Sequence, residues 1–438
     1  MNNAPLNELL STVVDNRGRT CPVADRGFPL IATNCVKSDQ LYPVYEKIRF
    51  VDDETYKNWF RGHPKPGDFI FVLKGSPGEV CLTPEPVPFC IAQDMVALRA
   101  NPEKVNPAFL FAFLRSKAAK DAILNMHVGT MIPHFKKGDF DKLIVPLPNE
   151  ISQQFIGDWY LTLSKKIELN RRTNETLEAL AQAIFKDWFV DFGPVRRKQE
   201  GATDPVTLLG GLITDPARAA EVAALFPGSF GDDGLPEGWE GISLLELADW
   251  VNGAAYKNMH FVPPDDGMPV IKIAELKAGV TSQTKFTNTD LGDRYRISND
   301  ELLFSWSGNP DTSIDAFIWT GGDAWLNQHI FAVRTNGKRS KPFLYVMLKF
   351  LMPEFSELAR NKQTTGLGHV TKADMKKIQV PVSPEELTQA FSALATLIFD
   401  RIVLSLHENR TLAETRDYLL PKLMSGEVRV GDIEELAG

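Results

Sequence analysis

Polar residues that could bind phosphate or base edges recur in two parts of the chain. Thr130, His134 and Lys137 in the first half return 235 positions later as Thr365, His369 and Lys372. A metal or acid–base role for these histidines would need acidic or further histidine neighbours, which the sequence does not place beside them. Histidine next to lysine and threonine suits hydrogen bonding to phosphate and base edges, and a turn-stabilising role fits equally well.

Sequence motifs for catalysis are absent or weak. No Gly-x-x-x-x-Gly-Lys-Ser/Thr phosphate loop occurs, which argues against nucleotide hydrolysis. One nuclease-like pattern joins Asp265 to Glu275 and Lys277, and its two carboxylates could hold Mg²⁺ beside a lysine. The matching stretch of the first half, residues 34–37, lacks the glutamate. We interpret the pattern as a surface loop followed by a strand, and we expect no catalytic residue and no metal ligand in this chain.

The composition indicates an ordinary globular protein of two or three domains. The chain has 438 residues, of which 43% are hydrophobic and 24% charged, and its net charge is −8. Residues 1–150 carry 18 basic and 17 acidic side chains, and residues 236–384 carry 16 and 17. The acidity therefore lies in the remaining segments, and a near-neutral half can still bind phosphate through a local basic face.

The cysteines and the apolar segments bear on the cellular compartment. The four cysteines, Cys21, Cys35, Cys81 and Cys90, form no Cys-x-x-Cys pair, and no histidine pair follows at zinc spacing. We interpret them as reduced, semi-apolar side chains. No uninterrupted apolar run reaches the roughly 18–20 residues needed to span a bilayer, and the N-terminus lacks a secretory pattern. We expect a cytoplasmic protein.

An internal duplication organises the chain. Gly27 to Ile31 matches Gly267 to Ile271, and Gln93 to Arg99 matches Gln328 to Arg334. The blocks keep their order at offsets close to 235, which chance resemblance would not preserve. Each half predicts a mixed α/β domain, with strands at residues 69–73 and 95–98 and a helix from Pro107 to Asn125, whose counterpart runs from Pro342 to Arg360.

Each half continues into a long helix with a heptad seam. Apolar and small residues alternate gaps of four and three from Ile156 to Trp188, and again from Phe391 to Leu423. Polar residues interrupt the seam at matching places, and we expect them to fix the register of the helix pair: Asn170, Asn174, Ser405 and Asn409. We expect the two helices to pair antiparallel; the alternative is that each packs only on its own domain.

These observations predict an α+β fold in which two pseudo-symmetric α/β domains are separated by two long antiparallel coiled-coil helices. The expected boundaries are 1–150 for domain one, 151–192 for helix one, 193–234 for a linker, 235–384 for domain two, and 385–438 for helix two and the tail. The linker holds a basic triplet, Arg196 to Lys198, which more often caps a helix end than binds DNA.

The pattern resembles the specificity subunits of type I restriction–modification systems over essentially the whole chain. The resemblance is carried by the duplicated plan, the entry segment Leu235 to Trp239, the helix segment Asn174 to Phe189, the C-terminal segment Leu419 to Glu427, and the Val-Pro pairs at 145–146 and 380–381. The first half lacks the Pro-x-Gly-Trp entry of the second, so its domain start is defined less sharply.

The resemblance implies a non-catalytic, cytoplasmic DNA-specificity subunit used in phage defence. Each domain would be a target-recognition domain that reads one half of a bipartite, asymmetric sequence in double-stranded DNA. The helices would set the length of the spacer, the DNA between the two half-sites that neither domain reads. They would also dock two methyltransferase subunits, and restriction subunits would complete the complex. S-adenosylmethionine, ATP and Mg²⁺ would be used by those partners, with no cofactor bound by this chain.

The candidate DNA-binding residues lie on loops that recur in both halves. In domain one they are Arg17, Arg19, Lys74, Ser76, Thr130, His134, Lys136 and Lys137. In domain two they are Tyr256, Lys257, Ser307, Asn309, Gln363, Thr364, Thr365, His369 and Lys372.

Two other interpretations remain open at this stage. The chain could be a specificity component of another phage-defence system. Alternatively, it could be a bilobed coiled-coil scaffold that binds no DNA. The net negative charge of the chain favours this alternative. Salt-dependent retardation of duplex DNA separates the last possibility from the others.

Overall fold

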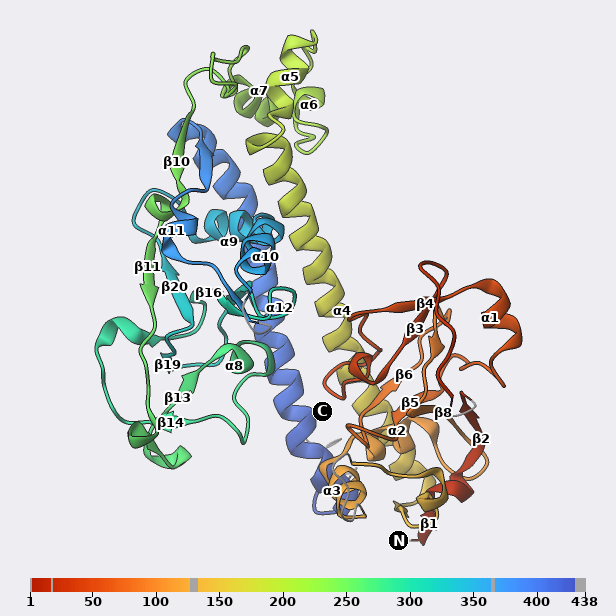
Figure 1. The fold of residues 1–438 in the computed structure, drawn as a ribbon. Helices are drawn as coiled ribbons and strands as arrows, with labels where there is room; N and C mark the ends of the chain where they lie inside the picture. Colours follow the sequence, from red (N-terminus) through yellow and green to blue (C-terminus); the bar gives the residue numbers. More distant parts are fainter. Residues whose placement is uncertain (1, 17–18, 127–132, 364–366, 430–438) are drawn as a thin grey trace. The chain divides into compact units, whose positions relative to one another are not determined.

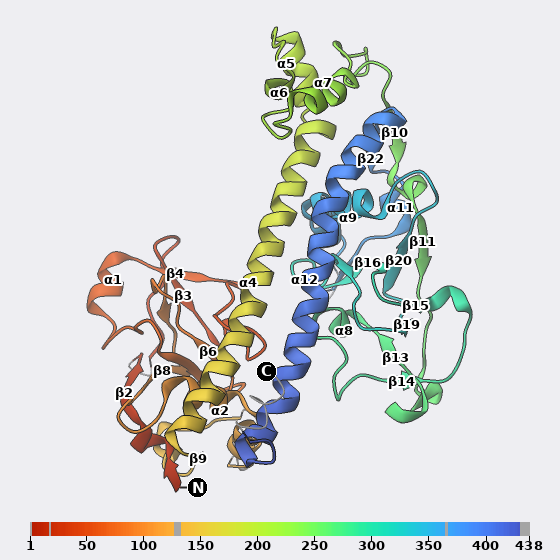
Figure 2. The same ribbon diagram turned by 180° about the vertical axis from the view of Figure 1, so that it is seen from behind.

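The computed structural model describes residues 2–16, 19–126, 133–363 and 367–429 (Figures 1 and 2). The contacts of the chain divide it into two compact units. Unit 1 comprises residues 1–170 together with 408–438, and unit 2 comprises residues 171–407. Each unit therefore contains one globular part and a portion of both long helices.

Unit 1 is centred on a four-stranded antiparallel sheet in the order β2-β8-β5-β6. Its strands are β2 (Leu10–Asp15), β8 (Met95–Ala100), β5 (Phe69–Val72) and β6 (Val80–Leu82). A second sheet comprises β4 (Arg49–Val51), β3 (Phe28–Ile31) and β7 (Cys90–Ile91), and β1 (Asn2–Pro5) pairs with β9 (Ile144–Leu147). All four residues of β5 are buried, as expected of a short run of aromatic and β-branched residues at the centre of a sheet.

Unit 2 repeats this plan. Its four-stranded sheet has the order β11-β20-β16-β18, formed by β11 (Asp249–Asn252), β20 (Ile330–Arg334), β16 (Leu302–Ser305) and β18 (Asp315–Ile318). A second sheet comprises β12 (Phe261–Val262), β14 (Phe286–Thr287), β13 (Met268–Ile271), β19 (Ala324–Leu326) and β15 (Arg296–Ile297). The remaining pairs are β10 (Glu240–Ser243) with β22 (Gln379–Val382), and β17 (Ser307–Gly308) with β21 (Gly368–His369).

The predicted duplication is confirmed by matching strand registers. Asp15 pairs with Val96 in unit 1, and Asn252 pairs with Phe331 in unit 2. The parallel pair β3–β7 likewise has its counterpart in β13–β19. Two mixed α/β domains of one topology therefore occur in this chain.

The single helix predicted over Pro107 to Asn125 is wrong in one respect, because it is two helices. α2 (Pro107–Arg115) ends at Ser116, whose extended backbone and side-chain hydroxyl cap the start of α3 (Lys117–Asn125). The counterpart is also split, into α9 (Lys341–Phe350) and α10 (Met352–Asn361), where a proline lies in the first turn of α10. The short helices α1 (Asp53–Asn58) and α8 (Ile273–Ala278) complete the two globular parts.

The two long helices are α4 (Glu150–Phe189) and α12 (Glu385–Ser425), and they run antiparallel as predicted. Within unit 1, Arg416 of α12 lies 3.5 Å from Ser164 of α4, and Leu420 and Leu423 are buried in the core. Within unit 2, the ring of Phe391 of α12 lies 6.0 Å from that of Trp188 of α4. The core of each unit therefore includes residues from both long helices.

The polar seam residues lie inside the helix pair. In unit 1, Asn170 donates hydrogen bonds to Asn409 at 2.9 Å and to Glu408 at 2.7 Å. In unit 2, Asn174 and Ser405 are buried, and Asn174 Oδ1 and Ser405 Oγ make no hydrogen bond to any described residue. A hydrogen-bonded amide pair within the seam favours one register, because a shift would leave the amides unpaired.

The segment between α4 and β10 contains three short helices, α5 (Gly193–Gln199), α6 (Pro205–Leu208) and α7 (Pro216–Ala224). Its basic triplet is engaged in local contacts. Arg197 forms a two-bond ion pair with Asp187, Arg196 stacks on Phe230, and Lys198 donates to a backbone carbonyl. Each of the three side chains therefore has a partner within the protein.

Helix α12 is the one helix in the described part of the chain that is long and apolar enough to cross a membrane, with a mean hydropathy of 1.4 over 18 residues. One third of this stretch is buried within the protein. Phe391, Ala395 and Ile402 are at most 2% exposed and pack in the core of unit 2. This packing accounts for the apolar residues on the buried side of the helix.

The four cysteines are free and buried, and all belong to unit 1. Burial raises the pKa of the Cys81 thiol and that of the Cys90 thiol to about 12 each. These thiols are therefore protonated at neutral pH and belong to the packing of the sheets.

A capping box fixes the start of α11 (Lys372–Met375), the short helix that follows β21. Thr371 donates to Asp374 through its backbone at 2.8 Å and through its hydroxyl at 2.6 Å, and Lys362 donates to the same carboxylate. Burial of Asp374 alone raises its pKa, but the hydrogen bonds from Lys362 and Thr371 outweigh this effect and bring the pKa to about 2. The segment from Gly368 to Lys372 is therefore held by a buried, ionised carboxylate.

We predict that Asn170→Ala destabilises the protein by about 1–3 kcal/mol, because it removes the hydrogen bonds that the Asn170 amide donates to Asn409 and to Glu408 in the helix pair. The midpoint of urea unfolding measures the effect. The double variant Asn170→Leu with Asn409→Leu should recover much of the loss, since both amides are then replaced by apolar groups. An Asn170→Ala protein as stable as the parent would contradict this role.

We predict that Asp374→Asn destabilises the protein at pH 6 by about 2 kcal/mol. The folded-state pKa of about 2 lies below the ordinary value of 3.8, so the carboxylate stabilises the fold above about pH 4 and this contribution is lost as the pH falls toward 2. The difference in unfolding free energy between parent and variant should fall by about half at pH 3. A difference that does not depend on pH would show that the ionised carboxylate is not responsible.

Candidate nucleic-acid interface

Two loops that are far apart in the sequence meet at one end of the central sheet of unit 1. The backbone of Phe135 donates to the carbonyl of Leu73 at 2.8 Å, and that of Gly75 donates to Pro133 at 3.0 Å. These bonds place Lys74 opposite His134 in an isolated antiparallel bridge. The candidate residues of both loops therefore lie side by side, with His134 exposed and Lys74 half-buried.

Unit 2 makes the equivalent connection. Val370 donates to the carbonyl of Trp306 at 2.9 Å, and Ser307 pairs with His369 between β17 and β21. Ser307 and His369 are both half-buried. The duplicated sequence blocks thus form the same paired loops twice, with a histidine on one side of each pair and with Lys74 or Ser307 on the other.

The two repeat-equivalent lysines are anchored in different ways. Lys137 forms an ion pair with Asp15, and Arg61 lies 3.4 Å from the same carboxylate. Burial alone raises the pKa of Asp15, but Lys137 and Arg61 together bring it below its usual value. Lys372 donates to the carbonyl of Trp250 at 3.0 Å and lies 5.4 Å from the ring centre of Phe331. The cation of Lys372 is therefore held mainly by neutral groups.

Several further candidates lie at the surface. The exposed residues are Arg19, Ser76, Lys136, Lys257 and Gln363. Asn309 is half-buried, and its side-chain oxygen accepts a hydrogen bond from the backbone of Asp311, which fixes the turn after β17. Arg17, Thr130, Thr364 and Thr365 lie outside the described residues.

Tyr256 requires a correction, because it does not lie on a surface loop. Its side chain is 8% exposed and packs with Ala254, Val270 and Trp325 in a small core. Burial raises the pKa of its hydroxyl above the ordinary value, and that hydroxyl makes no hydrogen bond to a described residue. We therefore no longer treat Tyr256 as a DNA-contact residue.

Three residues of unit 2 beside the paired loops were missing from the sequence-based set. Trp306 donates through Nε1 to Asn252 Oδ1 at 3.0 Å, and its ring centre lies 5.6 Å from that of His329. His329 belongs to the repeated block that begins at Gln328, so the duplication could have identified it. Asn252 and Trp306 carry no comparable signal, because neither belongs to the repeated blocks that identify the duplication.

The nuclease-like residues form no metal site. Glu275 is 7% exposed, and its carboxylate accepts hydrogen bonds from the backbone of Lys272 at 3.0 Å and from Thr284 at 3.1 Å. It therefore caps α8. In the described part of the chain, no group of three or more His, Cys, Asp or Glu side chains could hold a metal ion.

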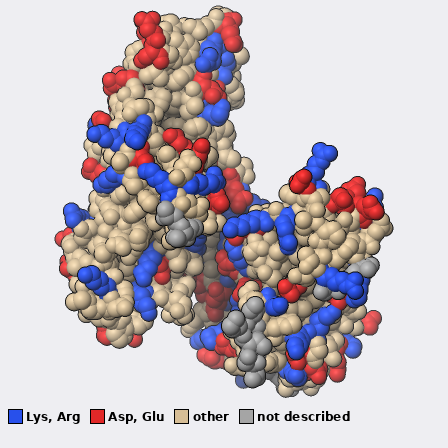
Figure 3. Space-filling view, in the orientation of Figure 1, with Lys and Arg blue, Asp and Glu red and all other residues tan. Residues whose placement is uncertain are grey.

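The charged side chains are mixed in sign on each unit. In the view of Figure 3, Lys and Arg side chains lie among Asp and Glu side chains. This agrees with the near-neutral composition of the two globular parts. Affinity for a polyanion must therefore come from local contacts, because mixed charges produce little long-range attraction.

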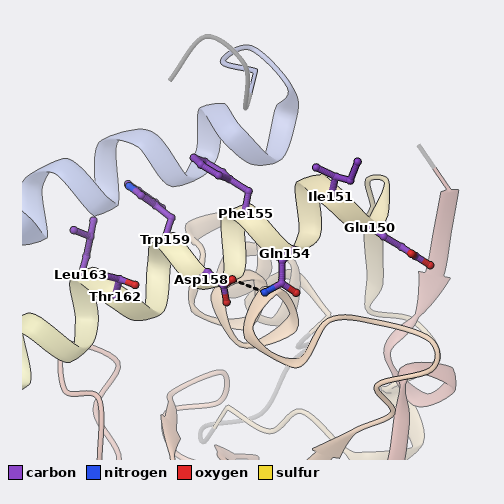
Figure 4. A pocket seen from close by; sticks show the side chains of 8 residues that line it. All are labelled: Glu150, Ile151, Gln154, Phe155, Asp158, Trp159, Thr162 and Leu163. Atoms are coloured by element: carbon purple, nitrogen blue, oxygen red, sulfur yellow. Dashed lines mark hydrogen bonds between the residues drawn. The ribbon is translucent and has the colours of Figure 1, made fainter. Parts of the chain in front are cut away.

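The first turns of α4 carry a second surface feature in unit 1. Ile151, Phe155, Trp159 and Leu163 lie along one side of the helix and line an open groove of about 730 Å³ (Figure 4). Ile151 is 76% exposed. An apolar stripe of this kind on a helix is typical of a surface that contacts a partner.

Comparison with known proteins gives a consistent result. The profile of the type I restriction modification DNA specificity domain matches residues 27–179 and again residues 236–401. The chain is 27% identical to the HindI specificity subunit of Haemophilus influenzae over 78% of this chain and 81% of that protein. It is 22% identical to the MjaIX specificity subunit of Methanocaldococcus jannaschii over 77% and 76% of the two chains.

A solved S subunit of a type I restriction–modification system from M. genitalium covers 96% of this chain and 95% of its own, with 14% identity and a TM-score of 0.48. The two profile matches cover well over half of the chain, and each falls on one copy of the duplicated domain. The chain belongs to the DNA-specificity subunits of type I restriction–modification systems.

Proposed function

We propose that each globular domain reads one half of a bipartite, asymmetric DNA sequence, and that the helix pair sets the length of the unread spacer. The observation that carries this proposal is the pair of equivalent loop contacts, Lys74 with His134 and Ser307 with His369. Two readers of one architecture with different side chains require two different half-sites. A helix of 40 residues is about 60 Å long, and a rigid element of this length can hold the two domains at the separation that a spacer of fixed length requires.

The helices also carry matching surfaces for partner subunits. Leu169 of α4 and Leu404 of α12 are repeat-equivalent and are 59% and 62% exposed. Exposed leucines at matching places on two duplicated helices favour two copies of one partner, since each copy of the surface can bind one. We assign these surfaces to two methyltransferase subunits, and the groove along the first turns of α4 would add to one of them.

The chemistry of the complex belongs to the partner subunits in this proposal. The specificity subunit is non-catalytic. The methyltransferase subunits would use S-adenosylmethionine to methylate adenines, and restriction subunits would use ATP and Mg²⁺ to cleave DNA. We place the complex in the cytoplasm, where the four free, buried cysteines remain reduced.

We predict that Lys137→Ala weakens binding to cognate and unrelated DNA by a similar factor, because a lysine contacts phosphate and carries no sequence information. The slope of log K against log salt should become less steep by about one. Fluorescence anisotropy of the chain assembled with its methyltransferase subunits measures both quantities. Lys104→Ala, an exposed lysine beyond the other end of β8, is the matched control. Loss of affinity for cognate DNA alone would contradict a phosphate contact.

We predict that Leu169→Lys and Leu404→Lys each weaken one of two methyltransferase sites, and that the double variant binds neither subunit. A charge at the centre of an apolar contact costs several-fold to hundredfold in affinity. Sedimentation velocity without DNA gives the number of subunits bound. Val280→Lys, at an exposed valine of the globular part of unit 2, should assemble normally. Full assembly of the double variant would exclude these leucines from the interface.

A further inference from the structure

The matching registers of the two central sheets allow a position-by-position comparison of the two reading faces. Val72 pairs with Met95 in unit 1, and Ser305 pairs with Ile330 in unit 2. The residues that follow β5 and β16, Leu73 and Trp306, are therefore equivalent. By the same registers, Asp94 is equivalent to His329, and Asp15 is equivalent to Asn252.

In unit 2, these positions form a neutral cluster of Asn252, Trp306 and His329. The indole Nε1 of Trp306 donates to Asn252 Oδ1 at 3.0 Å. The Trp306 ring packs at 5.6 Å from His329 and at 5.9 Å from Phe331, between ring centres. Burial lowers the pKa of His329, so its ring adds no positive charge to the cluster near neutral pH.

The backbone holds Asn252 at a fixed place. Gly253 follows it and donates to the carbonyl of Ile330 at 3.0 Å. A side chain at Gly253 would put its Cβ 2.2 Å from the carbonyl oxygen of Asn327, so this turn requires glycine. The backbone of Trp306 is also fixed, because its carbonyl accepts a hydrogen bond from the backbone N–H of Val370. Both partners of the side-chain hydrogen bond are therefore positioned by main-chain contacts.

The hydrogen bond from Trp306 decides which groups Asn252 can offer. An asparagine amide has one oxygen acceptor and two N–H donors. With Oδ1 turned toward the indole, the exposed side chain presents its amide NH₂ group, which donates to no other described residue. Asn252 is therefore a preoriented donor beside the paired loops of domain two.

In unit 1, the equivalent position has the opposite chemistry. Asp15 offers only acceptor oxygens, and it is ion-paired with Lys137 and Arg61. Leu73 cannot donate as Trp306 does. The two domains therefore differ at one matching position in hydrogen-bonding character and in charge.

We propose that Asn252, oriented by Trp306, is a specificity determinant of domain two and reads a guanine in its half-site. Guanine N7 and O6 are two neighbouring acceptors on the major-groove edge, and guanine itself offers no donor there, so it matches an outward-facing NH₂ group. Adenine and thymine each offer one major-groove acceptor, adenine N7 and thymine O4, so they give the NH₂ group one partner where guanine gives it two. This inference rests on the proposed function, because it requires that domain two reads base edges.

The test uses the full chain assembled with its methyltransferase subunits and a randomised duplex library, with sequencing of the bound DNA. Asn252→Asp keeps the shape and the hydrogen bond from Trp306 but removes the NH₂ donors. It should reduce the preference for guanine at one position of one half-site by about 10- to 100-fold, with the other half-site unchanged. Trp306→Phe keeps an aromatic ring but frees Oδ1, so the same position should accept adenine as well as guanine.

Asn299→Asp is the matched control. Asn299 precedes β16, at the opposite end of the strand from Trp306, and its Oδ1 also accepts a hydrogen bond, from the backbone of Gly322. This variant should select the parental sequence. Circular dichroism and assembly with the methyltransferase confirm that each variant is folded.

The outcomes separate the two levels of the proposal. If the parent selects a bipartite sequence and folded Asn252→Asp selects the same sequence, the assignment of Asn252 is wrong while the proposed function stands. A parental half-site of domain two without any fixed guanine would also overturn the assignment. If the assembled parent selects no sequence at all, the proposed function itself fails.

Discussion

The antiparallel pairing of α4 and α12 is the constraint on which the rest of the structure depends. Each globular domain is followed by one long helix, yet the core of each unit is completed by a segment of the helix that follows the other domain. Leu420 and Leu423 of α12 are buried in unit 1, and Phe185 and Phe189 of α4 are buried in unit 2. Neither core can therefore form fully until the helices have paired in the register that Asn170 and Asn409 favour.

The duplicated architecture could be predicted from the sequence because it rests on signals of long range. A heptad seam sustained over more than 30 residues defines each long helix, and conserved block order between the two halves defines the domains. The breaks between α2 and α3 and between α9 and α10 were not predicted. They depend on a single serine cap and a single proline inside segments that are otherwise helical in pattern.

The candidate site could be predicted at the level of loops but not of side chains. The structure brings Lys74 to His134 and Ser307 to His369, two pairs that equivalent sequence blocks place at equivalent positions. Tyr256 was misplaced because an aromatic residue beside a lysine on a loop gives no sign of whether it faces solvent or a small core. Asn252 was overlooked because its chemistry comes from its partner Trp306, which lies 54 positions away.

The uneven distribution of the cysteines has a consequence for following the unfolding of this protein. All four thiols are buried in unit 1, and burial raises the pKa of Cys81 and that of Cys90 to about 12, so these two residues hold almost no reactive thiolate in the folded state. An alkylating reagent can modify these sulfurs only when unit 1 opens. The rate of cysteine alkylation thus reports the opening of unit 1. Opening of unit 2 exposes no cysteine and does not change that rate.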